Sequence, residues 1–225
     1  MSKGKLIVID GTDGSGKATQ TNILVKRLKK KGYKVALADF PQYGQRSATL
    51  VEDYLNGKFG SAKEVGPYRS SIFFAVDRYA ASFQIRAWLH EGYIVISNRY
   101  VTANMGHQGG KIRDAKTRKK FFRWLDKLEF GLFGIPRPDA TLILHVPAAI
   151  AQTFVDKKRY RQYIGDVKRD LHEADIGHLK AAEKTYYEIA KLLPKTQRIE
   201  CSDGDRILRP EEIHRKIWTM VKKLI

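Results

Sequence analysis

The sequence predicts an α/β protein with one five-stranded parallel sheet and helices on both faces. Short apolar runs rich in β-branched residues alternate with longer amphipathic segments, which is typical of strands joined by helical crossovers. Such crossovers are right-handed, and they place helices on both faces of the sheet. The five runs cover residues 6–9, 35–38, 93–97, 141–146 and 198–201. A length of 225 residues suits a single domain spanning residues 1–225.

The first predicted strand leads directly into a glycine-rich turn. Residues 11–17 read Gly-Thr-Asp-Gly-Ser-Gly-Lys, and an amphipathic helix is expected from about Ala18. Three glycines let consecutive backbone N–H groups point at an anion, while the helix N-terminus and Lys17 add positive charge. The turn therefore predicts a phosphate-binding loop, or P-loop, for a nucleoside triphosphate. Its binding residues are Gly11, Thr12, Asp13, Gly14, Ser15, Gly16, Lys17, Ala18 and Thr19.

The turn departs from the P-loop template at one position. The template G-x-x-x-x-G-K-[ST] ends in a hydroxyl that touches Mg²⁺, but this chain has Ala18 there and Thr19 only afterwards. Asp10, at the end of the first strand, is the candidate that holds the metal through water. A buried ion pair or a turn partner is the alternative role for Asp10.

Polar and aromatic clusters accompany the next strands. Residues 39–44 (Asp-Phe-Pro-Gln-Tyr-Gly) end the second strand, and residues 73–78 lie in a long helix before the third. Residues 97–100 (Ser-Asn-Arg-Tyr) end the third, and Pro-Asp at 138–139 introduces the fourth. Ligands of parallel α/β sheets bind at the carboxyl ends of the strands, so these clusters and the P-loop are expected to share one site. Residues 56–69 are expected to form a surface excursion.

Two amphipathic segments and a charged stretch complete the chain. A charged segment over residues 157–171 is expected to be mobile. Apolar residues at helical spacing predict one helix near residues 176–193 and another that begins at Pro210. These apolar positions are Ile176, Leu179, Ala182, Ile189 and Leu193, and then Ile213, Ile217, Val221 and Leu224.

The chain is strongly basic, with 42 Lys and Arg against 24 Asp and Glu and a net charge of +18. Such a charge attracts polyanions, but no nucleic-acid recognition motif accompanies it, so only nonspecific nucleic-acid binding is expected. No apolar run is long enough to span a membrane, and no leader segment is expected. The single cysteine, Cys201, cannot form an internal disulfide, which favours a cytoplasmic location.

In this order the clusters resemble those of thymidylate kinases, P-loop enzymes that phosphorylate dTMP. The shared pattern is a P-loop with an internal Asp, Phe-Pro, Phe-x-x-x-Arg, an Arg-Tyr pair and Pro-Asp before a strand, from Leu6 to roughly Ala190. The resemblance implies a three-layer P-loop kinase fold with a mobile lid over about residues 157–171. It also implies transfer of the γ-phosphate of ATP to dTMP, with Mg²⁺, and a homodimer formed through the helix near residues 68–90.

The resemblance implies a role for each matching residue at the acceptor. Phe74 would stack on the pyrimidine, and Arg78, one helical turn later, would bond a base carbonyl. Arg99 would clamp the acceptor phosphate in the catalytic step, as Lys17 holds the donor. The remaining members of this acceptor site are Asp13 at the sugar 3′-hydroxyl, Phe40 of the Phe-Pro pair, Tyr43 at the phosphate, His107, and Asn104 and Gln108 as amides at the base edge or sugar.

A transition-state arginine is implied as well. The family supplies it from the P-loop or from the lid, and the P-loop position after Asp13 is Gly14. The lid would therefore supply it, and Arg159 and Arg161 are the chosen catalytic candidates. A solvated charge run is the alternative interpretation of this stretch.

Several positions depart from the family pattern. Asn98 stands where the family usually has an Asp that helps hold metal or acceptor, and His107 stands where many relatives carry a Tyr beside the sugar 2′ position. Two alternatives follow. The first is a kinase for another pyrimidine monophosphate, dUMP or UMP. The second is a basic nucleotide- or nucleic-acid-binding protein without turnover.

Overall fold

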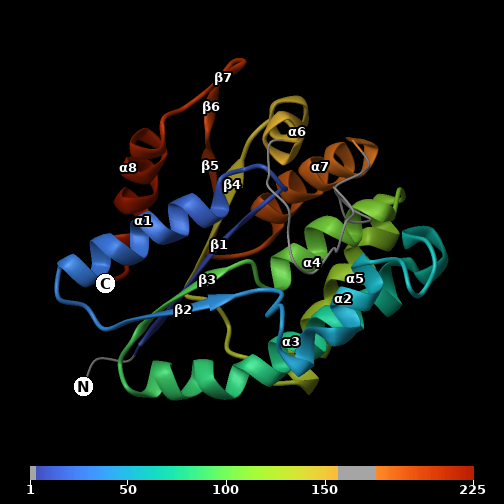
Figure 1. Ribbon diagram of the computed structural model, residues 1–225, viewed down its shortest axis with the longest axis horizontal. Helices are drawn as coiled ribbons and strands as arrows, with labels where there is room; N and C mark the ends of the chain where they lie inside the picture. Colours follow the sequence, from blue (N-terminus) through green and yellow to red (C-terminus); the bar gives the residue numbers. More distant parts are fainter. Residues whose placement is uncertain (1–3, 157–175) are drawn as a thin grey trace.

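A five-stranded parallel sheet forms the centre of the molecule. The computed structural model describes residues 4–156 and 176–225. Its strands lie in the order β2-β3-β1-β4-β5, and every neighbouring pair is parallel (Figure 1). The five predicted strands are confirmed, with ends that differ by one or two residues. Their bounds are β1 (Lys5–Gly11), β2 (Val35–Asp39), β3 (Ile94–Asn98), β4 (Ala140–His145) and β5 (Thr196–Glu200).

Helices cover both faces of this sheet and complete three layers. On one face, α1 (Lys17–Lys30) and α8 (Pro210–Val221) pack Leu24, Leu28 and Ile217 against Ile7 and Ile9 of β1. Figure 1 shows these two helices together on one side of the strands. The uninterrupted apolar sequence of β1 follows from this burial on two sides.

The opposite face carries α3 (Ala62–His90), α4 (Val101–His107), α5 (Ala115–Asp126) and α7 (Ile176–Leu192). Their side chains Ile85, Phe121 and Ile189 pack against Leu6 and Val8, the alternate residues of β1. Shorter elements are α2 (Thr49–Leu55), α6 (Ala148–Asp156) and an antiparallel hairpin of β6 (Ser202–Asp203) and β7 (Arg206–Ile207). The part of the chain that is described includes no helix long and apolar enough to cross a bilayer.

The stretch expected to be a surface excursion contains the start of α3. Ser61 caps this helix: its hydroxyl accepts from the Glu64 N–H, while the Glu64 carboxylate accepts from the Ser61 N–H at 2.7 Å. This capping box is a helix-start signal visible in the sequence. Gly66, at φ 74° and ψ 167°, and Pro67 then bend the helix near its beginning.

Candidate active site

The P-loop connects the end of β1 to the start of α1, and its glycines are required by close packing. A Cβ on Gly11 would lie 2.3 Å from the Leu144 carbonyl oxygen, and one on Gly14 would lie 2.2 Å from the Ala151 carbonyl oxygen. Both glycines have positive φ angles, 139° and 79°. The backbone therefore turns tightly between β4 and α6, a conformation that side chains would block.

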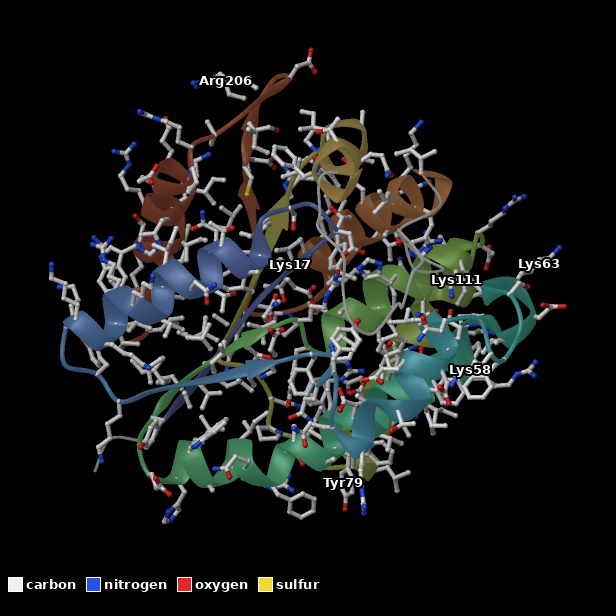
Figure 2. All side chains as sticks on the ribbon, in the orientation of Figure 1. Lys17, Lys58, Lys63, Tyr79, Lys111 and Arg206 are labelled. Atoms are coloured by element: carbon white, nitrogen blue, oxygen red, sulfur yellow. The ribbon has the colours of Figure 1, made fainter. Side chains whose placement is uncertain are left out.

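The interior of this loop holds polar groups suited to an anion. The hydroxyls of Thr12 and Ser15 are buried, and neither has a hydrogen-bond partner among the described residues. The Lys17 Nζ folds over the loop and donates to the Thr12 carbonyl at 2.7 Å. Figure 2 shows Lys17 at the centre of the molecule, whereas Lys63 and Arg206 extend from its edge. Unsatisfied buried donors beside a lysine fit a phosphate ligand.

A cleft of about 610 Å³ opens between the P-loop and the ends of β2 and β3. Lys17, Ala18 and Thr19 line its P-loop side. Phe40 and Tyr43 line the wall after β2, where Tyr43 is exposed and Phe40 is otherwise buried in the core against Tyr100. Asp39, Asn98 and Arg99 complete the wall at the strand ends. The structure thus brings the predicted donor loop and the predicted acceptor clamp into one cavity.

Arg99 has an unusual backbone conformation for a non-glycine residue. Its φ of 64° lies in the left-handed region, and its N–H donates to the Ile9 carbonyl at 2.9 Å. The guanidinium forms an ion pair with the P-loop carboxylate of Asp13. Burial alone would lower the pKa of Arg99, but the Asp13 carboxylate and weaker contributions from neighbouring acidic groups together more than offset this, so the pKa is raised. Arg99 therefore keeps its charge at every working pH.

A second group of predicted residues gathers around Glu129. Arg78 is 2% exposed and donates through Nε and Nη2 to both carboxylate oxygens of Glu129, at 2.6 and 2.8 Å. The Asn104 amide donates to the Ser71 carbonyl at 3.0 Å and lies 3.5 Å from Glu129 Oε1. Arg78 and Asn104, both predicted to bind the base, thus lie beside the same buried carboxylate of Glu129.

Phe74 and Gln108, which are also predicted to bind the acceptor nucleotide, contact residues of α2 and α3. Phe74 packs against α2 with its ring edge-on to Tyr54, at a centroid distance of 6.2 Å. The Gln108 carbonyl oxygen accepts from the Ser70 hydroxyl at 2.8 Å and from Lys111 Nζ at 2.6 Å. Burial lowers the pKa of Lys111 to about 8.

A family model described as thymidylate kinase matches residues 9–203, which include the P-loop and most of the sheet. The chain belongs to the thymidylate kinase family. A thymidylate kinase of Mycobacterium tuberculosis is 32% identical over 188 residues, covering 82% of this chain and 85% of that protein. A probable thymidylate kinase of Pyrobaculum aerophilum is 29% identical over 226 residues, covering 97% of each chain.

A solved thymidylate kinase from Candida albicans has the same fold. It superposes with a TM-score of 0.75 at 22% identity, over 99% of this chain and 93% of that one. The predicted P-loop kinase fold is therefore confirmed, and the chain is a nucleoside monophosphate kinase of the thymidylate kinase family.

Asp10 lies beneath the P-loop of this thymidylate kinase family member, not in the cleft. It is fully buried, and its Oδ1 accepts from the Gly11 N–H and the Tyr186 hydroxyl, both at 2.8 Å. The Thr102 hydroxyl donates to Oδ2. Both carboxylate oxygens of Asp10 thus accept hydrogen bonds from neighbouring groups.

A different carboxylate faces the cleft. Asp39 ends β2 directly opposite Asn98 of β3, and the Asn98 amide donates to Asp39 Oδ1 at 2.8 Å. The walls of the cleft exclude enough water to raise the pKa of Asp39, although Asn98, Arg99 and Lys17 partly offset this rise. The described residues contain no cluster of three or more His, Cys, Asp or Glu side chains placed to hold a metal.

Some expectations lie beyond the described residues, and two carboxylates that pair with buried arginines were missed. Arg159, Arg161 and the predicted lid at 157–171 fall in the range 157–175, which the structure leaves undescribed. Glu129 and Glu188, the partners of Arg78 and Arg118, carry no local motif. An acid between apolar neighbours, Leu128 and Phe130, was the one available signal for Glu129.

Proposed function

We propose that this protein transfers the γ-phosphate of ATP to dTMP and forms ADP and dTDP. Membership of the thymidylate kinase family supports the reaction class. The observation that carries the proposal is the single cleft lined by both Lys17 of the P-loop and Arg99 at the end of β3. One lysine for the donor and one arginine for the acceptor, facing a common cavity, suit a transfer between two phosphates.

The protein contributes position and charge to this reaction. The P-loop N–H groups and Lys17 hold the donor phosphates, and Arg99 and Tyr43 hold the acceptor phosphate. Asp13 binds the sugar hydroxyl, while Phe74, Arg78, Asn104 and Gln108 bind the base. Phosphoryl transfer needs little covalent chemistry from the enzyme, so aligned charges supply most of the rate enhancement. Arg159 or Arg161 supplies the charge for the transition state from the lid.

The cleft fits Mg²⁺ bound with the nucleotide. Bound Mg²⁺ neutralises phosphate charge during the transfer. This ion keeps several waters and needs only one or two carboxylates beside the phosphates, so the absence of a hydroxyl at Ala18 is tolerable. Asp39, which lies opposite Asn98 and lines the cleft, is the carboxylate we assign to this role, in place of Asp10.

Asp39→Asn is expected to raise the Mg²⁺ concentration needed for half-maximal activity by about 10- to 100-fold. The substitution retains an oxygen that accepts from Asn98 and removes only the charge. Because the pKa of Asp39 is raised, its carboxylate takes up a proton sooner on acidification than an ordinary aspartate. The Mg²⁺ requirement of the wild type should therefore rise as the pH falls, and that of the variant should not.

Mn²⁺ binding to the ADP–dTMP complex, followed by electron paramagnetic resonance, measures the metal affinity apart from turnover. Asp53→Asn is the matched control, because Asp53 forms a salt bridge to Lys58 at 2.6 Å outside the cleft. Equal Mn²⁺ affinity in the wild type and the Asp39 variant would exclude this role for Asp39.

The acceptor is tested by ADP release with ATP and Mg²⁺ against dTMP, dUMP, UMP, dCMP and dGMP. The proposal expects the highest kcat/KM with dTMP. A preference for dUMP or UMP would keep the kinase and change the assignments at the base and sugar. No turnover with any acceptor would contradict the proposal and favour a nucleotide-binding protein without turnover.

We also propose a cytoplasmic homodimer that forms through α3. Five large apolar side chains on this helix are exposed at helical spacing: Tyr68, Ile72, Val76, Tyr79 and Phe83, at 41, 42, 36, 39 and 58%. An exposed apolar row of this kind suits a partner surface. Phe83→Glu is expected to convert the dimer to a monomer at micromolar concentration in sedimentation velocity experiments. The control is Phe59→Glu, which changes an exposed phenylalanine (41%) outside α3 and should leave the dimer intact.

A further inference from the structure

Arg99 has a second partner besides Asp13. Its Nη1 lies 2.9 Å from Nε2 of His107, while Nη2 pairs with the Asp13 carboxylate. The guanidinium plane is thus held at two points, one on the P-loop and one at the end of α4. His107 is 5% exposed, and the ring of Tyr186 meets it edge-on at a centroid distance of 5.9 Å.

The contact with Arg99 determines the tautomer of His107. A guanidinium donates hydrogen bonds and never accepts them, so His107 Nε2 must lack a proton and act as the acceptor. In the neutral ring the proton then lies on Nδ1. His107 Nδ1 is 3.2 Å from Nε2 of His178 on α7, so it donates to that nitrogen. The two rings stack at a centroid distance of 5.5 Å.

The charge state of His107 agrees with this assignment. Burial, together with the positive charge of Arg99, holds the pKa of His107 well below its usual value. A protonated ring would place an N–H against an N–H of Arg99, and this contact would be repulsive. The ring is therefore neutral, and both of its nitrogens take part in this chain of hydrogen bonds.

We propose that His107 is a positioning residue, which accepts from Arg99 through Nε2 and thereby aims the guanidinium at the acceptor phosphate. His178 fixes the tautomer by accepting from Nδ1. The inference deepens the proposed function and rests on it. Since both ring nitrogens are occupied, His107 acts on the acceptor through Arg99 and not as a direct hydrogen-bonding group for the sugar.

The experiment compares two substitutions with opposite hydrogen-bonding ability. His107→Gln keeps an acceptor for Arg99 and a donor for His178, whereas His107→Phe keeps the ring volume and removes both. His107→Phe is expected to lower kcat/KM for dTMP by about 10- to 100-fold, because a small misplacement of a positioned group costs that much. Its KM for ATP should stay unchanged, and His107→Gln should recover most of the loss. His178→Phe should give a smaller loss of the same kind.

A double-mutant cycle of His107→Phe with Arg99→Ala distinguishes an effect that acts through Arg99 from an unrelated disturbance of the site. If His107 acts through Arg99, then His107→Phe costs nothing further in the Arg99→Ala background. His214→Phe is the matched control, because His214 is another buried histidine, on α8 across the sheet, and should retain full activity. The proposal would be overturned if the losses of kcat/KM from His107→Phe and Arg99→Ala multiplied in the double variant. It would also be overturned if His107→Gln lowered kcat/KM as much as His107→Phe.

The tautomer can also be measured in the wild-type protein, so this test does not depend on whether a variant folds. Long-range ¹H–¹⁵N correlation spectra distinguish the protonated from the unprotonated nitrogen of each histidine ring. We expect His107 with its proton on Nδ1, and a proton on Nε2 would overturn the inference. Failure of the proposed function is a different result: the wild type would then turn over no dTMP while this tautomer persisted.

Discussion

Lys17→Ala is expected to abolish phosphoryl transfer, with a loss of about 10³-fold or more in kcat, and to leave the fold intact. The Lys17 Nζ lies within the P-loop and donates to the Thr12 carbonyl. Lys17 also lines the cleft, so it is placed for donor phosphates. Steady-state ADP release measures the loss, and thermal unfolding by circular dichroism checks the fold.

Lys30→Ala is the control for this substitution. Lys30 is an exposed residue in the last turn of α1, the helix that begins at Lys17. Lys30→Ala therefore removes the same charge at a site away from the cleft. Its activity should equal that of the wild type. A Lys17→Ala enzyme with normal turnover would mean that the P-loop is not the donor site.

Glu129→Ala is expected to have the largest effect on stability, lowering the free energy of unfolding by about 3–5 kcal/mol. The Glu129 side chain is fully buried, and both of its oxygens accept from Arg78. Removing Glu129 leaves the buried Arg78 guanidinium without the carboxylate to which it is hydrogen-bonded. Urea unfolding, followed by fluorescence of the tryptophans, measures the difference.

The matched control is Asp126→Ala, which removes a second two-point contact between an acid and an arginine. Asp126 pairs with Arg137 at 2.7 and 2.9 Å, but the two side chains are 42 and 61% exposed. Water already screens this pair, so its loss should cost less than about 1 kcal/mol. Equal effects of the two substitutions would show that the buried pair gains nothing from its burial.

The Glu129 pair also changes what Arg78→Ala is expected to do. The sequence presents Arg78 as a base-binding side chain, whose loss should weaken acceptor binding. Its buried ion pair adds a structural role, because removal strands the Glu129 carboxylate in the core. Arg78→Ala should therefore lower both the affinity for dTMP and the free energy of unfolding.

The strands and the P-loop could be predicted because their signals are local. Apolar runs mark β1 to β5, and the glycine spacing with Lys17 marks the loop within a few residues of sequence. Glu129 and His178 could not be assigned in this way. They meet Arg78 and His107 across 51 and 71 residues of sequence, contacts that exist only once the helices pack.

Asn98 illustrates the same limit. From the sequence alone, Asn98 indicates that a metal-binding carboxylate is missing, because the sequence does not show which residue lies beside it in space. The β2–β3 register places Asp39 directly opposite it, so an acid is still present at this end of the sheet. The roles of Asp39, Arg99 and the other site residues stay predictions that the substitutions above would test.

The contact between Gly14 and α6 limits how this enzyme could evolve. Members of the family carry the transition-state arginine either in the P-loop or in the lid. On sequence alone, the single substitution Gly14→Arg would place one in the P-loop. Here an added Cβ would lie 2.2 Å from the Ala151 carbonyl oxygen, and the backbone φ is 79°. An arginine could not settle at position 14 until mutations elsewhere had moved α6. The order in which substitutions could bring an arginine to position 14 is therefore constrained by backbone packing.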